Sequence, residues 1–201
     1  MLSSITPLGE RGRRARWPVT VAFYITGSVL GGVLVGAMAG GLGQLLSSFV
    51  RLPLTSGLVI VAVAALVCAA MDTDRLRGHL PTIHRQVNED WLDTYRSWVY
   101  GTGFGLQLGM GVVTIVTTAA VYLLGLVALL SGSIWVGLSI GALFGLARAL
   151  PALRLRSVTT PDRLASLFRR LSAAEPHARA TTIAGQATVA LAAATVAVMA
   201  G

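Results

Sequence analysis

The chain has 201 residues, of which 54% are hydrophobic and 12% are charged, and its formal net charge is +8 at pH 7. This balance excludes an ordinary soluble domain and is typical of an integral membrane protein. The positive charge is all arginine and gathers between the long apolar runs. It therefore predicts membrane topology and contact with lipid, not binding of nucleic acid.

Four long runs of the sequence carry no charged side chain, whereas a bilayer core needs only roughly 20 apolar residues in helical form. These runs cover 17–50, 52–71, 97–147 and 180–201. We therefore predict an all-α, polytopic membrane protein of about five spans. A basic arm over 1–16 precedes a single transmembrane domain over 17–201. The spans are expected at about 18–50, 55–71, 98–130, 133–147 and 181–200.

The arginines predict the orientation of these spans, because basic residues collect in cytoplasmic loops. Three clusters fall in the arm and in the loops 72–97 and 148–180, while Arg51 stands alone. This places the N-terminus and both loops in the cytoplasm and the C-terminus outside, in the plasma (inner) membrane of a bacterium. Each loop carries apolar residues at helical spacing and is expected to form an amphipathic helix at the headgroups. The sequence Thr160-Pro161-Asp162 marks a helix start in the second loop.

The first and third spans are longer than a bilayer requires. In the first, Gly40-Gly41-Leu42-Gly43 is the expected break. A long glycine-rich helix, a turn, a second helix and an arginine-rich loop occur twice, over 18–85 and 98–156. This pattern predicts an internal repeat whose two copies insert in the same orientation, a common architecture of small transporters.

Glycine recurs every fourth residue in three spans. Small residues at this spacing let helix backbones approach closely in lipid. We expect these positions to pack helices together or to form oligomer contacts. They are Gly32, Gly36, Gly40, Gly101, Gly105, Gly109, Gly137, Gly141 and Gly145.

Polar residues follow one face of the predicted third span. Gln107, Thr114, Thr118 and Tyr122 share this face, and Gln44 of the first span and Gln186 of the fifth are candidate partners. An amide in hydrocarbon requires hydrogen-bond partners. The face is either a set of contacts between helices or a polar path for a solute.

Residues that could perform chemistry are scarce in the predicted spans. None of the spans contains Asp, Glu, Lys, Arg or His, which argues against a proton-driven carrier and against acid–base catalysis. Cys68 is the single cysteine, so neither an internal disulfide nor a thiolate cluster is expected. His79 and His84 do not share a helix face, and the sequence predicts no metal site, no cofactor and no catalytic residue.

The arginines of the two loops are candidate contacts for a partner protein or for lipid phosphates. They comprise Arg75, Arg77 and Arg85 of the first loop and Arg163, Arg169 and Arg170 of the second.

Around Trp98-Val-Tyr-Gly101-Thr-Gly-Phe-Gly105-Leu-Gln107-Leu-Gly109 the chain resembles the membrane domains of cytochrome c biogenesis proteins. The likeness covers roughly 18–147 and rests on hydropathy, long glycine-rich helices and the repeat. It implies thiol–disulfide electron conduits built from repeated units with interrupted helices. That family places paired cysteines or a Pro-Cys sequence in those helices, and this chain has neither in its long spans.

Three functions follow from these patterns. The leading hypothesis is a non-catalytic membrane subunit or scaffold that binds a partner protein, as a homo- or hetero-oligomer. A small permease or channel with a path lined by Gln and Thr is the alternative. The third is a relative of the thiol–disulfide conduits that lacks their cysteines.

Overall fold

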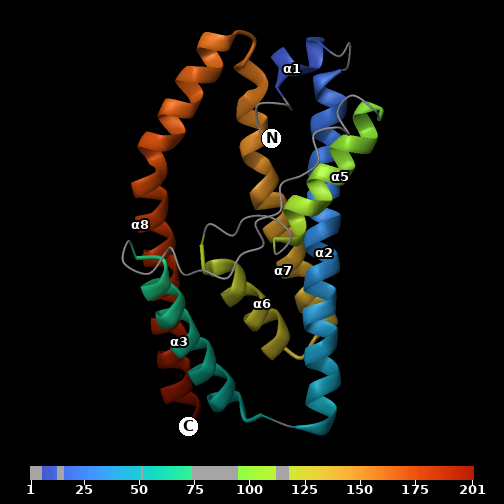
Figure 1. Cartoon of the computed structure of the whole chain (residues 1–201). Helices are drawn as coiled ribbons and strands as arrows, with labels where there is room; N and C mark the ends of the chain where they lie inside the picture. Colours follow the sequence, from blue (N-terminus) through green and yellow to red (C-terminus); the bar gives the residue numbers. More distant parts are fainter. Residues whose placement is uncertain (1–5, 13–15, 51, 74–94, 112–117) are drawn as a thin grey trace.

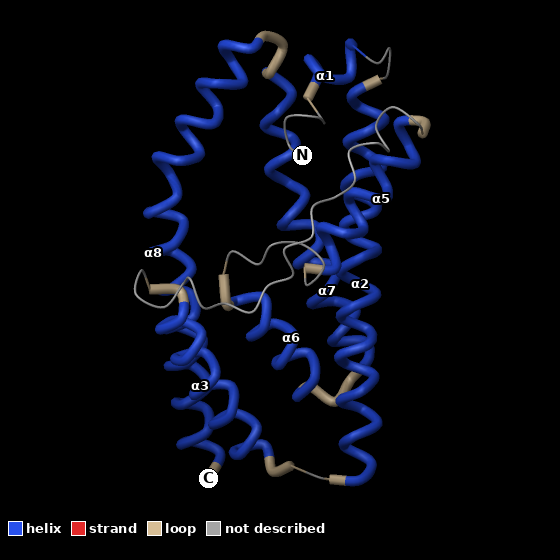
Figure 2. The backbone as a smooth tube through the Cα atoms, viewed as in Figure 1, coloured by secondary structure: helices blue, strands red, loops and turns tan. Residues whose placement is uncertain are grey.

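The structure, a computed structural model, describes residues 6–12, 16–50, 52–73, 95–111 and 118–201. Throughout these residues the secondary structure is helical, with no strand (Figure 2). Helices satisfy their own backbone hydrogen bonds, which a bilayer core demands. Four helices are long and apolar enough to span a membrane, and a shorter apolar helix accompanies them. The elements are α1 (Pro7–Gly12), α2 (Trp17–Phe49), α3 (Leu54–Met71), α5 (Ser97–Met110), α6 (Ala120–Leu130), α7 (Ile134–Ala149), the 3-10 helix η2 (Leu150–Ser157) and α8 (Pro161–Ala200).

α2 and α8 run the length of the bundle, whereas α3 occupies only the end that carries the C-terminus, and the described ends of the chain lie at opposite ends of the bundle (Figure 1). The first and second passes are α2 and α3; α5 and α6 form the third, α7 the fourth and α8 the fifth. α2 packs along α5 and α7, whereas α3 pairs with α8, and α6 lies between these two groups. α2–α3 and α5/α6–α7 follow the same order and direction, as the predicted repeat requires. The duplication itself stays a prediction.

The first span is a continuous helix of 33 residues, which corresponds to roughly 50 Å. The predicted break at Gly40-Gly41-Leu42-Gly43 is wrong. Gly40 instead lies against the backbone of Ser133, just before α7, and Gly43 lies against the backbone of Leu129 in the last turn of α6. A helix break in a bilayer would expose unpaired backbone groups, so glycines here serve close packing and leave the helix intact.

The third span is interrupted, so the continuous helix predicted over 98–130 is wrong. α5 ends at Met110, and Gly111 follows with a φ of 70°, a conformation that side chains other than glycine rarely adopt. The amide of Gly111 closes α5 by donating a hydrogen bond to the carbonyl of Leu108. α6 begins only at Ala120. The interruption therefore separates two halves of one pass through the molecule.

The second predicted loop is mostly helix. α8 begins where the sequence indicates, since Thr160 caps it by accepting a hydrogen bond from the amide of Arg163. It then continues for 40 residues through Pro176, so a single helix carries both the amphipathic segment of the predicted loop and the predicted fifth span. Leu164 and Leu167 pack against a buried cluster that includes residues of η2. That apolar contact explains why this half of α8 stays beside the bundle.

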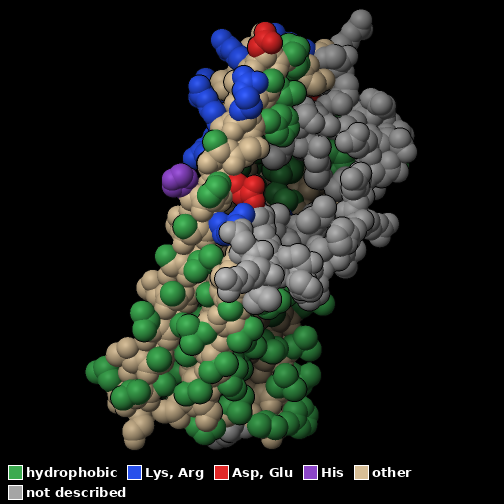
Figure 3. Space-filling view, turned by 60° about the vertical axis from the view of Figure 1, so that its left-hand side comes forward, with side chains coloured by type: hydrophobic (Ala, Val, Ile, Leu, Met, Phe, Trp, Pro, Cys, Tyr) green, Lys and Arg blue, Asp and Glu red, His purple; other side chains and the backbone are tan. Residues whose placement is uncertain are grey.

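The distribution of side chains agrees with a membrane protein. Hydrophobic side chains cover the lower half of the face in Figure 3, and the arginines gather in the upper part of that face. The lower half contains the C-terminal part of α8 and its partner α3, whose mean hydropathies place both among the candidate spans. The upper part is the end at which α1, α5 and the start of α8 lie.

Candidate functional site

The glycine positions predicted to pack helices lie at close backbone contacts. A Cβ on Gly32 would overlap the carbonyl oxygen of Gly141, and one on Gly36 would overlap that of Gly137. Conversely, a Cβ on Gly141 or Gly137 of α7 would overlap the carbonyl oxygen of Gly32 or Gly36 of α2. Along α5, a Cβ on Gly101 would come within 2.8 Å of the carbonyl oxygen of Thr20. The three helices α2, α5 and α7 thus form a tightly packed unit.

The rest of the predicted glycine set lies at the same two seams. A Cβ at any of these positions would reach within about 3 Å of a backbone atom of the facing helix, with Ser28, Tyr24 and Ser133 supplying the nearest oxygens. Ser28 is fully buried at the meeting point and donates a hydrogen bond of 2.7 Å to the carbonyl of Gly145. The remaining glycines of the set are Gly40, Gly105, Gly109 and Gly145.

A buried carboxylate joins the second group of helices. Asp72 follows the last residue of α3, is only 2% exposed, and accepts hydrogen bonds from three donors. These are the Thr118 hydroxyl, the Ala119 amide at 2.8 Å and the Gln186 side-chain amide at 2.9 Å. The carboxylate lies at the first turn of α6, where the helix dipole favours negative charge. We call Asp72, Thr118, Ala119 and Gln186 the Asp72 junction.

The Asp72 junction corrects two expectations. The sequence places Asp72 at the start of the predicted cytoplasmic loop 72–97, outside the spans. The structure instead buries it among α3, α6 and α8, so an ionisable group does lie inside the helix bundle. Thr118 of the predicted polar face belongs to the junction, but through Asp72 and Gln186, not through Gln107.

The remaining residues of the predicted polar face do not meet. Gln107 is half-buried on α5, above the interruption, while Tyr122 is on α6 below it. Gln44 is exposed near the opposite end of α2, where its side-chain oxygen accepts a long hydrogen bond of 3.4 Å from the amide of Ile134. Thr114 lies outside the described residues. The single face fails because the helix that would carry it is interrupted at Gly111.

A cavity of about 690 Å³ adjoins the Asp72 junction. Besides Asp72 and Thr118, it is lined by Arg154 of η2 and by both apolar and polar residues of α8, namely Leu171, Ala174, Glu175, Ala178, Arg179 and Thr182. On that helix Glu175 and Arg179 form an ion pair at 3.2 Å. Figure 3 shows acidic and basic side chains together in this upper part of the face. The buried carboxylate therefore borders a charged recess at the arginine-rich end.

A second buried carboxylate was not predicted, because Glu10 was assigned to a polar arm. It is 1% exposed and accepts hydrogen bonds from the Thr20 hydroxyl at 2.9 Å and the Tyr100 hydroxyl at 2.8 Å. Glu10 thereby fastens α1 to α2 and α5. The sequence did hold a signal for this role, because Glu10 is the single acidic residue in the arginine-rich segment 1–16.

The predicted partner or lipid contacts divide into two groups. Arg163, Arg169 and Arg170 are exposed on the N-terminal half of α8. Arg163 donates hydrogen bonds to the carbonyl of Ser157 and the hydroxyl of Thr159, which holds it against the helix start. The second group, from the first predicted loop, lies outside the described residues and comprises Arg75, Arg77 and Arg85.

Cys68 is buried in the last turn of α3, 8% exposed, in a cluster with Ala119, Leu123 and Ala190. The described residues hold no group of three or more His, Cys, Asp or Glu side chains that could bind a metal ion. His79 and His84 lie outside them. What the described geometry offers is a packed scaffold with a buried hydrogen-bonding junction and a basic surface.

Comparison with known proteins agrees with this architecture. Residues 2–193 match the family model described as cytochrome C biogenesis protein transmembrane region. The curated proteins called methylamine utilization protein MauF are 35% identical in Paracoccus versutus, over 78% of this chain and 59% of that protein. The corresponding values are 34%, 80% and 58% for Paracoccus denitrificans. For Methylophilus methylotrophus they are 33%, 75% and 53%.

The chain thus matches somewhat more than half the length of these relatives. No solved structure matches it. The match to the family model covers nearly all of the chain and includes α2, the interrupted pass and α7, which are the elements on which the resemblance rests. The chain therefore belongs to the family of cytochrome c biogenesis protein transmembrane regions.

Proposed function

We propose that this chain is a non-catalytic, accessory membrane subunit that binds a partner polypeptide in a system for methylamine utilization. The observation that carries the proposal is the exposed basic surface of Arg169 and Arg170 on the N-terminal half of α8. Membership of the family and the names of the relatives support an accessory role. The methylamine context is taken from those names.

The position of Arg169 and Arg170 favours a polypeptide over lipid as their partner. Only the last part of α8, from Ala180 onward, is free of charge, and at 1.5 Å per residue it fills a hydrocarbon core of about 30 Å. Arg170 precedes Ala180 by roughly 15 Å of helix. The headgroup layer on one side is only about 5–8 Å thick. If the axis of α8 is perpendicular to the membrane plane, the two arginines lie beyond the lipid phosphates, where they face a partner outside the bilayer.

The environment of Cys68 supports a role without thiol chemistry of its own. A thiol–disulfide relay needs a thiolate that is accessible to its partner. Cys68 is the one cysteine of the sequence, and it lies among alanine and leucine side chains of three helices. A buried cysteine of this kind acts as a small apolar residue.

The charge pattern supports an orientation for this subunit. The arginine-rich end, with α1 and the start of α8, is proposed to lie in the cytoplasm, and the end of α8 on the opposite side. On this basis the membrane is the inner membrane of a bacterium, and the partner of Arg169 and Arg170 is cytoplasmic. A polar path for transport has no support, since Gln107 and Tyr122 lie on opposite sides of the interruption.

A chimera tests the proposal. In Paracoccus denitrificans, the part of the methylamine utilization protein MauF that matches this chain is replaced by the chain, and growth on methylamine is compared with growth on succinate. We expect growth on both. Loss of growth on methylamine alone, with the chimera present in the membrane at the normal level, would contradict the shared role.

Two sets of variants in the chimera test the mechanism. R169E/R170E should abolish growth on methylamine, while R169K/R170K, which keeps the charge, should preserve it. Cys68→Ala should also preserve growth, because the thiol is not used. If Cys68→Ala stops growth on methylamine while the protein level is unchanged, the chain uses thiol chemistry and the non-catalytic role is wrong.

A further inference from the structure

The Asp72 junction forces α6 to diverge from α2. At its C-terminal end α6 touches α2, since a Cβ on Gly43 would overlap the carbonyl oxygen of Leu129. At its N-terminal end, the amide of Ala119 is hydrogen-bonded to Asp72, on the side of α3 and α8. α6 therefore leans away from α2 and α7 as it approaches the interruption (Figure 1). A wedge-shaped space between these helices is the geometric consequence.

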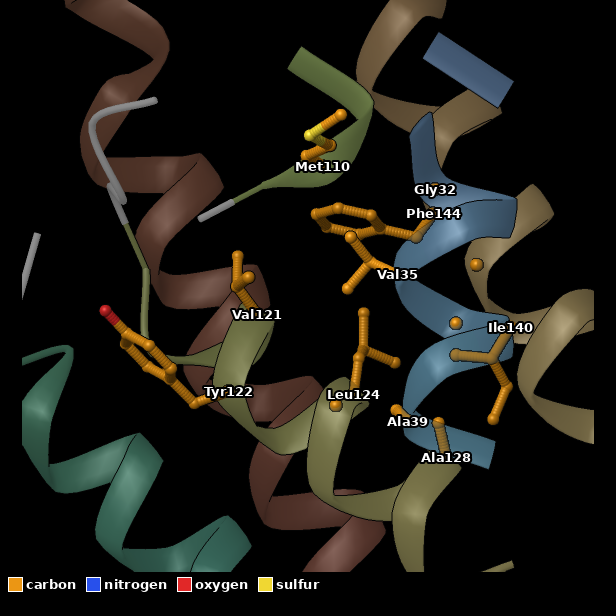
Figure 4. Close-up of a pocket in the computed structure, with 13 residues that line it drawn as sticks. Gly32, Val35, Ala39, Met110, Val121, Tyr122, Leu124, Ala128, Ile140 and Phe144 are labelled. Carbon is orange, nitrogen blue, oxygen red and sulfur yellow. The ribbon is translucent and has the colours of Figure 1, made fainter. Parts of the chain in front are cut away.

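That space is an apolar cavity of about 170 Å³ (Figure 4). Met110 lies above it, Val121 and Leu124 of α6 lie on one side, and Val35 and Phe144 on the other. Among the described residues that line it, Tyr122 alone has a polar side chain, and its hydroxyl points away from Phe144. The described walls of the cavity are therefore apolar apart from this one side chain.

Gly125 keeps the cavity open. A Cβ on this residue would meet nothing within 4 Å, whereas the glycines of α2 and α7 other than Gly41 are packed against backbone. Glycine lowers the stability of a helix interior by roughly 0.5–1 kcal/mol relative to alanine. Close packing offsets this cost for the glycines at the α2–α7 contact, but no such contact does so for Gly125. Its lack of a side chain instead preserves volume beside Leu124 and Ala128.

An apolar cavity of this size is a poor site for water, which needs two to four polar partners. In soluble proteins, a dry apolar cavity of about 150 Å³ takes up benzene or xenon. Val35 and Gly36 lie near the middle of α2, a candidate membrane span, so the medium at this depth is lipid hydrocarbon. Leaving the space empty would forfeit dispersion contacts along four helices.

We propose that the acyl chain of one membrane phospholipid enters this wedge and packs between α6 and the α2–α7 seam. The chain substitutes for the helix–helix contact that the Asp72 junction prevents. It binds by shape and apolar contact, so the site selects a hydrocarbon chain and makes no demand on the headgroup. The lipid is a structural ligand of the interrupted third pass and is independent of the partner proposed for α8.

Photolabelling tests this proposal on the full chain in native-like vesicles. The probe is a phosphatidylethanolamine that carries a diazirine in the middle of one acyl chain, and labelled residues are mapped by mass spectrometry. We expect labels on Val121, Leu124 and Phe144 as well as on the exposed, lipid-facing Leu66. Gly125→Leu fills the cavity and should reduce the labels on α6 and Phe144 at least fivefold, with Leu66 unchanged.

Gly57→Leu is the matched control, because Gly57 also has open space around it but lies on α3, away from the cavity. It should label like the wild type. Equal labelling of the cavity residues in Gly125→Leu and wild type would overturn the proposal. So would a wild type in which Val121, Leu124 and Phe144 carry no label.

A measurement on the wild type alone covers the case in which Gly125→Leu does not fold. The labelled lipid is incorporated, the protein is exchanged into lipid-free detergent, and only then is it photolysed. A chain held in the wedge should still label the cavity residues, with a stoichiometry near one, while the label on Leu66 is lost. Loss of all labels together would show that no acyl chain is held there.

Discussion

Removing the Asp72 carboxylate should loosen the link between α3, α6 and α8. In Asp72→Ala, the Thr118 hydroxyl, the Ala119 amide and the Gln186 amide lose their common acceptor in a site that is 2% exposed. Each buried donor left without a partner costs roughly 1–3 kcal/mol. The three losses are coupled, so we expect Asp72→Ala to lower the free energy of unfolding by about 3 kcal/mol or more.

Asp72→Asn should be milder, by about 1–2 kcal/mol. The asparagine oxygen still accepts from the Ala119 amide, and its NH₂ group can donate to the Gln186 side-chain oxygen, which is buried and has no hydrogen-bond partner in the described structure. The assay is reversible unfolding in mixed micelles titrated with SDS. Asp162→Ala is the control, since this exposed acid in the first turn of α8 contributes only about 0.3–1 kcal/mol. If Asp72→Ala unfolds no earlier than Asp162→Ala, the junction does not hold the helices together.

Three further predictions concern packing and helix ends. Gly36→Ala should destabilise the protein by about 1–3 kcal/mol in the same SDS titration, because its Cβ would overlap the Gly137 carbonyl oxygen. Gly57→Ala, in open space, should be neutral or stabilising by up to about 1 kcal/mol, and equal effects of the two would contradict the packing. Glu10→Ala should release α1 and speed tryptic cleavage after Arg11 several-fold, whereas an unchanged rate would show that α1 is not held by this carboxylate. Thr160→Ala should cost about 1 kcal/mol in SDS unfolding through loss of the α8 cap, and Ser172→Ala, away from the helix start, serves as its control.

The long apolar helices were predictable from the sequence, because hydrophobicity and the absence of charge report directly on the bilayer. α3 begins within one residue of its predicted start and ends at its predicted end. Thr160 marks the start of α8 through a local interaction between a cap and the first turn. Local patterns of this kind do not depend on which helices become neighbours.

The interruption of the third pass was missed because hydropathy does not respond to backbone conformation. Residues 97–147 are uncharged throughout, so their hydropathy gives no sign that a membrane-spanning helix is interrupted. The available signal was Gly111 followed by a run of β-branched residues from Val112 to Thr118, a composition with low helix propensity. In the first span the opposite error occurred, since a glycine cluster was expected to break a helix that in fact uses Gly40 and Gly43 for packing.

The Asp72 junction could not be predicted because its members are far apart in the sequence. Asp72, Thr118 and Gln186 lie on three segments, and their contact depends on how α3, α6 and α8 assemble. Sequence position alone placed Asp72 at the edge of a charged loop. The same limitation applies to Glu10, whose partners Thr20 and Tyr100 come from two different helices.

Native mass spectrometry of the full chain, extracted from the membranes of its own host in mild detergent, tests the accessory role most directly. We expect a complex with a second polypeptide that survives in R169K/R170K and dissociates in R169E/R170E. Isolation of the chain only as a monomer or a homodimer, with α8 unaltered, would contradict the proposed partner-binding function.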